Sequence, residues 1–153
     1  MRSYSQVYIM MVFGVKYRLG LIEPDWQSKL HSVIGNLVND LDGVQSLQVG
    51  GFKDHVHILI STKGIVSLKE IVRYVKTESS KWVNNNRLTI GRFGWQDGCG
   101  KFSYSQSQIA AVKNYISNQE EHHKVISFRE EYAGFLKRSG IEITPYLLPE
   151  DLV

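Results

Sequence analysis

A chain of 153 residues with only three prolines is expected to form one domain, residues 1–153, with a core large enough for independent stability. Its net charge of +3 and isoelectric point near 8.9 permit a local basic groove for nucleic acid but do not require one. The single Cys99 excludes an intramolecular disulfide, no apolar run is long enough to cross a bilayer, and the N-terminus lacks the pattern of a signal peptide. These features predict a cytoplasmic protein without a membrane partner.

The chain is predicted to begin with a strand and a helix. Residues 4–17 are rich in Tyr, Val, Ile, Met and Phe, which is typical of a strand buried on both faces, and we expect this strand at the centre of a sheet. After a turn over residues 18–23, Pro24 suits the first position of a helix that ends at Asp42 and Gly43. Its apolar stripe consists of Trp26, Leu30, Val33, Ile34, Leu37, Val38 and Leu41.

A hairpin and a second helix are predicted next. Residues 44–49 and 52–60 form the two strands of the hairpin, and Gly50-Gly51 allows a bend between them. Ser67 suits the cap of the following helix because Glu70 stands three residues later. The buried stripe of this helix, which is expected to fade near residues 84–86, consists of Leu68, Ile71, Val72, Val75, Ser79 and Trp82.

This order of elements is typical of an α+β fold of the ferredoxin-like, split βαβ type with an antiparallel sheet. The last strand comes from either residues 93–95 or residues 101–104. Residues 52–60 then form a central strand, and Tyr115 lies on an added C-terminal helix.

Two helices are predicted in the last third of the chain. Ser105 or Ser107 can cap the helix that carries Tyr115. Its inward positions are Ile109, Val112, Ile116 and Val125. Ser127 begins a short amphipathic helix that ends at Ser139-Gly140.

The predicted strand over residues 52–60 carries two histidines with one apolar residue between them. Because side chains alternate along a strand, the imidazoles of His55 and His57 point to the same face and can grip a metal ion. Val56, Ile58 and Ile60 point to the other face, where they can enter a core. The histidines therefore lie on a rigid support, which favours a site formed before the metal arrives.

Tyr115 and Gln119 stand four residues apart, which places them on one face of the predicted helix. Imidazole nitrogens and an amide oxygen are acceptable to Mg²⁺ or Mn²⁺ when phosphate oxygens and water complete the shell. A phenol oxygen can attack a phosphate that such an ion polarises. Together the four residues predict phosphoryl transfer through a tyrosine.

The same residues carry a family resemblance. His55-Val56-His57 resembles the HUH motif, in which U is a large apolar residue, and Tyr115-Ile116-Ser117-Asn118-Gln119 resembles the Tyr-x-x-Asn-Gln segment of single-tyrosine HUH transposases. The similarity extends, in the same order, to residues 8–16, Gly51-Phe52-Lys53-Asp54, Ser79-Ser80-Lys81-Trp82, Trp95-Gln96-Asp97-Gly98 and Phe102-Ser103. The chain thus resembles the TnpA-type transposases of small bacterial insertion sequences, with REP-associated tyrosine transposases, which act on repetitive palindromes, as the nearest variant.

The resemblance implies a DNA transposase that cleaves and rejoins single-stranded DNA beside hairpins at the ends of an element. Tyr115 is implied as the nucleophile that forms a 5′-phosphotyrosine, and His55, His57 and Gln119 as the ligands of Mg²⁺ or Mn²⁺. It also implies a homodimer in which the tyrosine helix of one subunit can complete the other subunit's site.

Contacts with nucleic acid are expected from cations interleaved with aromatic residues, a mixture that suits a groove for phosphates and exposed bases. The candidates are Lys53, Arg73, Lys81, Arg92, Trp95, Lys101 and Phe102. Trp95 and Phe102, in a glycine-rich loop, are the rings expected to touch bases, whereas Trp82 is expected in the core.

Other interpretations of these residues stay open. The histidines can be a hydrogen-bonded strand pair without a metal, Tyr115 a half-buried helix residue, and Asp54 either a partner of the histidines or a turn residue. His122 and His123 lie near the Tyr115 face and are alternative ligands or DNA contacts, but a surface role is favoured. The rival functions are a non-catalytic DNA or RNA hairpin-binding protein of the same fold and a metal-dependent hydrolase that uses water.

Overall fold

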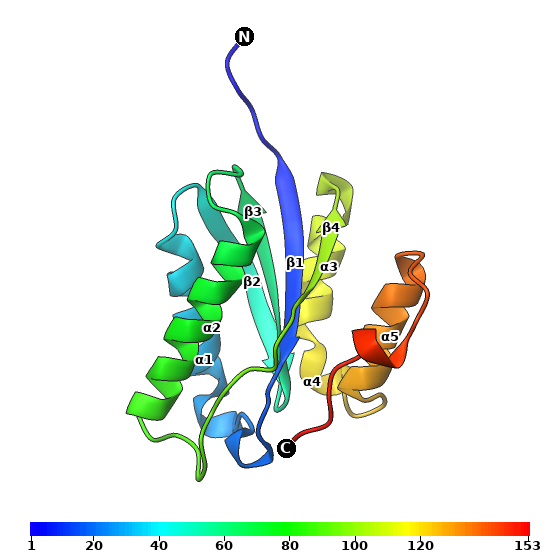
Figure 1. The fold of residues 1–153 in the computed structure, drawn as a ribbon. Coiled ribbons are helices and arrows are strands. Elements are labelled where there is room, and N and C mark those ends of the chain that lie inside the picture. Colours follow the sequence, from blue (N-terminus) through cyan, green and yellow to red (C-terminus); the bar gives the residue numbers. More distant parts are fainter.

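The computed structural model describes residues 1–153 and contains one four-stranded antiparallel sheet with five α-helices (Figure 1). The strands are β1 (Val7–Gly14), β2 (Val44–Phe52), β3 (His55–Thr62) and β4 (Gly100–Tyr104). The helices are α1 (Pro24–Asn39), α2 (Leu68–Asn85), α3 (Ile109–Ser117), α4 (Gln119–His122) and α5 (Phe128–Arg138). The strand order β2-β3-β1-β4 and the succession β1-α1-β2-β3-α2-β4 confirm the predicted ferredoxin-like α+β fold.

Helices cover both faces of the sheet: α1 and α2 lie on one face, and α3, α4 and α5 lie on the other (Figure 1). The alternating side chains of β1 serve both layers. Met11 and Phe13 join the cluster under α1 and α2, while Met10 and Val12 join the cluster under α3 and α5. The prediction of a central first strand buried on both faces is therefore confirmed.

The predicted starts of α1, α2 and α5 agree with the structure, whereas Ser105 caps a 3-10 turn before α3, whose own N-cap is Gln108. Pro24 occupies the first turn of α1, and the hydroxyl of Ser67 accepts a hydrogen bond of 3.1 Å from the backbone N–H of Glu70 at the start of α2. Ser127 caps α5 in the same way, accepting from the backbone N–H of Glu130 at 3.1 Å. No helix in the structure combines the length and apolar character needed to span a membrane.

The predicted bend at Gly50-Gly51 is wrong, because both glycines lie inside β2 and the turn falls at Lys53 and Asp54. Gly50 is needed for a different reason. A Cβ atom on Gly50 would lie 2.7 Å from Cγ2 of Ile116 and would collide with the carbonyl of that residue. Glycine therefore lets α3 lie directly on β2.

The helix predicted to carry both Tyr115 and Gln119 is broken in the structure. Helix α3 ends at Ser117, and Asn118, with φ −100° and ψ 19°, separates it from the single turn of α4. Val125, expected to face inward, follows α4 and is 84% exposed. Of the two candidate last strands, residues 101–104 belong to β4, whereas Trp95 forms only an isolated bridge with Val15.

Candidate active site

The two histidines of β3 are both fully buried and point toward the layer formed by α3, α4 and α5. Val56, Ile58 and Ile60 point to the opposite face and enter the cluster under α1 and α2, as the alternation predicts. The centroids of the two imidazole rings lie 5.1 Å apart. A strand at the centre of the sheet thus holds both rings in fixed positions.

The structure brings Tyr115 and Gln119 to these histidines despite the break between α3 and α4. Oε1 of the buried Gln119 lies 2.8 Å from Nε2 of His55. The ring of Tyr115, which is half-buried, has its centroid 5.8 Å from that of His57, edge to face. All four residues predicted for catalysis and metal binding therefore meet within one chain.

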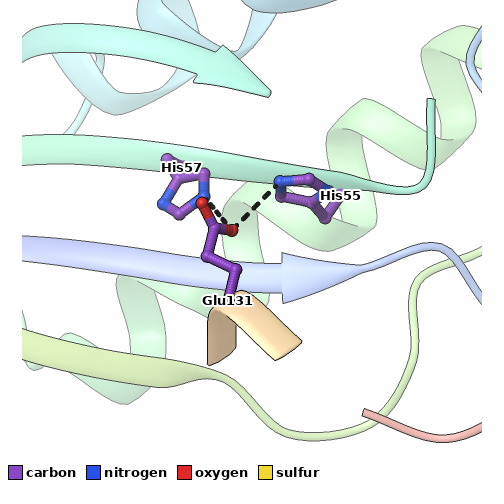
Figure 2. A group of neighbouring side chains, drawn as sticks. All are labelled: His55, His57 and Glu131. Atoms are coloured by element: carbon purple, nitrogen blue, oxygen red, sulfur yellow. Dashed lines mark hydrogen bonds and ion pairs between the residues drawn. The ribbon is translucent and has the colours of Figure 1, made fainter. Parts of the chain in front are cut away.

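A carboxylate that the sequence analysis missed lies at the centre of the site. Glu131 on α5 is 2% exposed, and Oε1 lies 3.0 Å from Nε2 of His57 and 3.5 Å from Nε2 of His55 (Figure 2). Oε2 accepts hydrogen bonds from the hydroxyl of Tyr115 and, at 2.9 Å, from Nε2 of Gln119. Glu131 thus joins the two imidazoles to the phenol.

A sequence signal for Glu131 existed. Phe128 and Phe135 define the buried stripe of α5, and Glu131 stands three residues after the first and four before the second. An acidic residue at that position points into the molecule, where it needs cationic or hydrogen-bonding partners.

The surface role expected for the adjacent histidines of the α4 region is wrong for one of them. The side chain of His123 is 3% exposed, and Nε2 lies 2.9 Å from Oε1 of Gln119 and 3.2 Å from Oε1 of Glu131. The side chain of His122 is 32% exposed, and Nε2 lies 3.2 Å from the hydroxyl of Tyr115. His123 therefore belongs to the buried cluster, while His122 lies at its edge.

The environment sets the protonation of the central groups. Burial would raise the pKa of Glu131, but close contacts of its carboxylate with the imidazoles of His123 and His57 outweigh it and hold the pKa well below its usual range. Burial lowers the pKa of His57 to about 4. Burial, together with the neighbouring Glu131 carboxylate, raises the pKa of Tyr115. Near neutral pH the carboxylate is therefore ionised, and the phenol keeps its proton.

The donor atoms fit a divalent cation. One ligand atom from each of His55, His57 and Glu131 lies within 4.8 Å of the others. Nδ1 of His55 lies 2.7 Å from Oδ1 of Asp54, and an ionised carboxylate can only accept, so Nδ1 carries the hydrogen. This leaves the lone pair of His55 on Nε2, which faces the cluster, an arrangement typical of metal-ligating histidines.

Two aromatic residues expected to contact nucleic acid lie in the core instead. Trp95 and Phe102 are each 8% exposed. The Trp95 ring packs edge-on against Phe13 and donates a hydrogen bond of 2.9 Å to the hydroxyl of Ser79, and Phe102 packs against Phe135. Neither ring has a free face for a base, so the expected stacking does not fit the structure.

The basic residues expected to contact nucleic acid are not gathered at the site. Arg73 and Lys81 lie on α2, on the opposite side of the sheet, and each pairs with a glutamate one turn earlier. Arg92, in the loop after α2, lies over the ring of Tyr17, which follows β1. Lys101 precedes Phe102, which points to the site layer, so Lys101 faces away from the site. Lys53, in the turn just before β3, is nearest to the histidines along the chain.

Comparisons with known proteins give the family and the fold of this chain. The family model described as "Transposase IS200 like" matches residues 3–119, which include both histidines, Tyr115 and Gln119. A provisionally named transposase from Deinococcus radiodurans R1 has a similar solved structure, with a TM-score of 0.59 and 17% identity over 78% of this chain and 95% of that one. A REP-associated tyrosine transposase bound to a REP hairpin has a TM-score of 0.59 and 12% identity over 82% of this chain and 74% of that one. No curated protein matches the sequence.

At these identities the two solved structures support the fold, whereas the family match covers most of the chain, including both histidines, Tyr115 and Gln119. The chain belongs to the IS200-like transposase family.

Proposed function

We propose that this chain is a tyrosine transposase that cleaves and rejoins single-stranded DNA at hairpin-flanked ends of an element. The observation that carries the proposal is the hydrogen bond from the hydroxyl of Tyr115 to Glu131, whose other oxygen lies 3.0 Å from Nε2 of His57. A phenol, a carboxylate and an imidazole from three separate elements therefore meet at one buried point. Membership of the IS200-like family supports the same assignment.

Tyr115 acts as the nucleophile. Its oxygen forms a bond to the scissile phosphorus, the bond from phosphorus to the 3′ oxygen breaks, and the phenol loses a proton while the 3′ oxygen gains one. The products are a 5′-phosphotyrosine and a free 3′-hydroxyl. Because the phosphodiester energy is kept in the tyrosine ester, a 3′-hydroxyl can reverse the step without a nucleotide cofactor. Glu131 holds the phenol in place for the attack.

His55, His57 and Gln119 would hold a divalent cation, Mg²⁺ or Mn²⁺. When bound, such an ion polarises the phosphate and stabilises the charge that develops on it. Asp54 fixes the His55 ring so that Nε2 faces the site. The central strand keeps both imidazoles in position before substrate arrives.

A groove of about 640 Å³ beside Tyr115 offers a path for the strand. It is lined by the rings of Tyr104 and Phe135 and by the guanidinium of Arg138, which lies 4.9 Å from the centroid of Phe135. The half-buried ring of Tyr104 and the guanidinium of Arg138 suit an unstacked base and its phosphate. We take the partner to be single-stranded DNA with a hairpin, the class of ligand to which a REP hairpin belongs.

Each chain is expected to cleave with its own tyrosine, because Tyr115 already reaches His57 within one subunit. The homodimer that the family resemblance implies stays a prediction.

A covalent-adduct assay tests the proposal. The protein is incubated with a single-stranded hairpin substrate and Mn²⁺, and the products are separated under denaturing conditions. Wild type is expected to form a protein–DNA adduct, and Tyr115→Phe to lose it while still binding the hairpin. Tyr146→Phe, which alters a tyrosine that is 93% exposed, is the matched control and should keep the adduct.

Three outcomes contradict the proposal. An adduct that persists in Tyr115→Phe assigns another nucleophile. Hairpin binding by wild type without any adduct indicates a binding module. Cleavage that survives the substitution indicates attack by water.

A further inference from the structure

His123 is held as a metal ligand would be, although no role was assigned to it above. Nδ1 lies 2.8 Å from the carbonyl oxygen of Ile126, which can only accept, so Nδ1 carries the hydrogen. In the neutral ring the lone pair is then on Nε2. That atom lies 2.9 Å from Oε1 of Gln119 and 3.2 Å from Oε1 of Glu131. The lone pair of His123 therefore faces two oxygen atoms.

His55 shows the same arrangement from the opposite side. Nδ1 donates to Asp54, and Nε2 faces Oε1 of Gln119 at 2.8 Å and Oε1 of Glu131 at 3.5 Å. The orientation of the Gln119 amide is fixed, because its NH₂ group donates to Oε2 of Glu131 at 2.9 Å. Two ring nitrogens and two oxygens thus point lone pairs at one another, which is unfavourable unless protons or a cation lie among them.

The spacing of these atoms suits a cation. Each of the three Nε2 atoms lies 2.8 to 3.5 Å from Oε1 of Gln119, of Glu131 or of both. Adjacent ligands of a six-coordinate ion with bonds of about 2.1 Å lie about 3 Å apart. The side chains of His123 and Glu131 are 3% and 1% exposed, so bulk water does not compete for these atoms. The contacts between ring nitrogens and oxygens therefore have the spacing of adjacent ligands, and they lie in a dry part of the molecule.

We propose that His123 and Glu131 are ligands of the same ion as His55, His57 and Gln119, and that this five-donor site takes a transition-metal ion such as Mn²⁺ in preference to Mg²⁺. The proposal rests on the metal site of the proposed function and extends it beyond the histidine pair. Three imidazoles favour transition metals, whereas Mg²⁺ prefers oxygen donors and retains several waters. One coordination position then stays available for a phosphate oxygen.

The ligands also come from outside the family match. Residues 3–119 contain the histidine pair and Gln119, whereas His123 follows α4 and Glu131 lies on α5. The segment that follows α4, which includes His123 and Glu131, therefore supplies ligands to the metal site.

Isothermal titration of Mn²⁺ and Mg²⁺ into the metal-free protein tests the ligand set. Wild type is expected to bind Mn²⁺ at least about tenfold more tightly than Mg²⁺. His123→Ala and Glu131→Gln should each weaken Mn²⁺ binding by about 100-fold or more, the upper end of the loss caused by removing a supporting residue. His122→Ala is the matched control: the ring is adjacent in sequence, but its Nε2 faces Oε2 of Glu131 at 3.4 Å and the phenol of Tyr115, so Mn²⁺ affinity should not change.

Electron spin echo envelope modulation of bound Mn²⁺ counts coordinated imidazoles and needs no destabilised variant. Three imidazoles are expected in wild type and in His122→Ala, and two in His123→Ala. Two imidazoles in wild type, equal affinity for Mg²⁺ and Mn²⁺, unchanged Mn²⁺ affinity in both His123→Ala and Glu131→Gln, or no Mn²⁺ binding at all would each overturn the proposal. The adduct assay on Tyr115 decides the proposed function separately, so the two failures are distinguishable.

Discussion

Tyr115 on α3 and Glu131 on α5 are joined by a hydrogen bond from the phenol to the carboxylate. The second oxygen of that carboxylate lies 3.0 Å from Nε2 of His57, so the Glu131 side chain alone links the phenol to the imidazole. The hydroxyl therefore faces the buried polar cluster and not the apolar core. This relationship makes attack by Tyr115 beside a histidine-bound cation geometrically reasonable within a single chain.

The contact of α3 with β2 leads to a prediction about Gly50. Replacing Gly50 with alanine places Cβ against the backbone and side chain of Ile116, which pushes away the helix that carries Tyr115. Gly50→Ala should lower the free energy of unfolding by about 1–3 kcal/mol, measured by urea denaturation. The control is Gly35→Ala in α1, where the nearest atom lies 3.5 Å away and alanine should stabilise by about 0.5–1 kcal/mol. Equal effects at the two positions would contradict the close approach.

The bond between Asp54 and His55 predicts an effect on metal affinity. Asp54→Ala removes the acceptor that holds Nδ1 of His55 and fixes the direction of Nε2. Affinity for Mn²⁺ should fall by about 10–100-fold in calorimetric titration. Asp54→Asn, which keeps an acceptor oxygen, should lose less. Unchanged affinity in Asp54→Ala would mean that packing alone orients the ring.

Two serine caps with the same geometry allow the effect of α5 on metal binding to be distinguished from its effect on stability. Ser67 on α2 and Ser127 on α5 each accept a hydrogen bond of 3.1 Å from a backbone N–H three residues later. Either alanine substitution should cost about 1 kcal/mol of unfolding free energy. Only Ser127→Ala should also weaken Mn²⁺ binding, because α5 carries Glu131. A matching loss of affinity in Ser67→Ala would contradict this assignment.

His31 on α1 predicts that the protein loses stability in acid. Burial lowers its pKa to about 4, and its buried Nε2 has no hydrogen-bond partner. As the pH falls below 6.5, His31 becomes protonated in the unfolded chain but stays neutral in the folded chain. The free energy of unfolding therefore decreases between pH 6.5 and 4. The contribution is up to about 3 kcal/mol.

Replacing His31 with glutamine isolates that contribution. Urea denaturation with a chelator present, at pH 6.5 and pH 4.5, should show a smaller acid-induced loss in His31→Gln than in wild type. Parallel losses in the two proteins would show that His31 ionises as readily in the folded state as in the unfolded one.

The correct predictions come from patterns that span only a few residues, such as alternation along a strand and the residues at a helix start. Alternation along β3 placed His55 and His57 on one face and Val56 on the other, and local capping chemistry located the starts of α1, α2 and α5. These features depend on neighbours within a few residues.

Contacts between distant segments account for what was missed. Glu131 stands 74 residues from His57 in sequence, and nothing local indicates that its carboxylate meets two imidazoles. The break at Asn118 lies between two helices that both contact β2, and Gln119 reaches His55 without a continuous helix. Trp95 and Phe102 were predicted to contact bases from an exposed loop. Their burial depends on packing between distant segments, which no local pattern reveals.

The most direct test of the central claim identifies the residue that carries DNA. Wild-type protein is reacted with a single-stranded hairpin substrate and Mn²⁺, digested with nuclease and trypsin, and analysed by tandem mass spectrometry. A nucleotide phosphate should appear on the tryptic peptide of residues 114–124, whose only tyrosine is Tyr115. Cleaved DNA with that peptide unmodified, or the nucleotide attached to any other residue, would contradict the account.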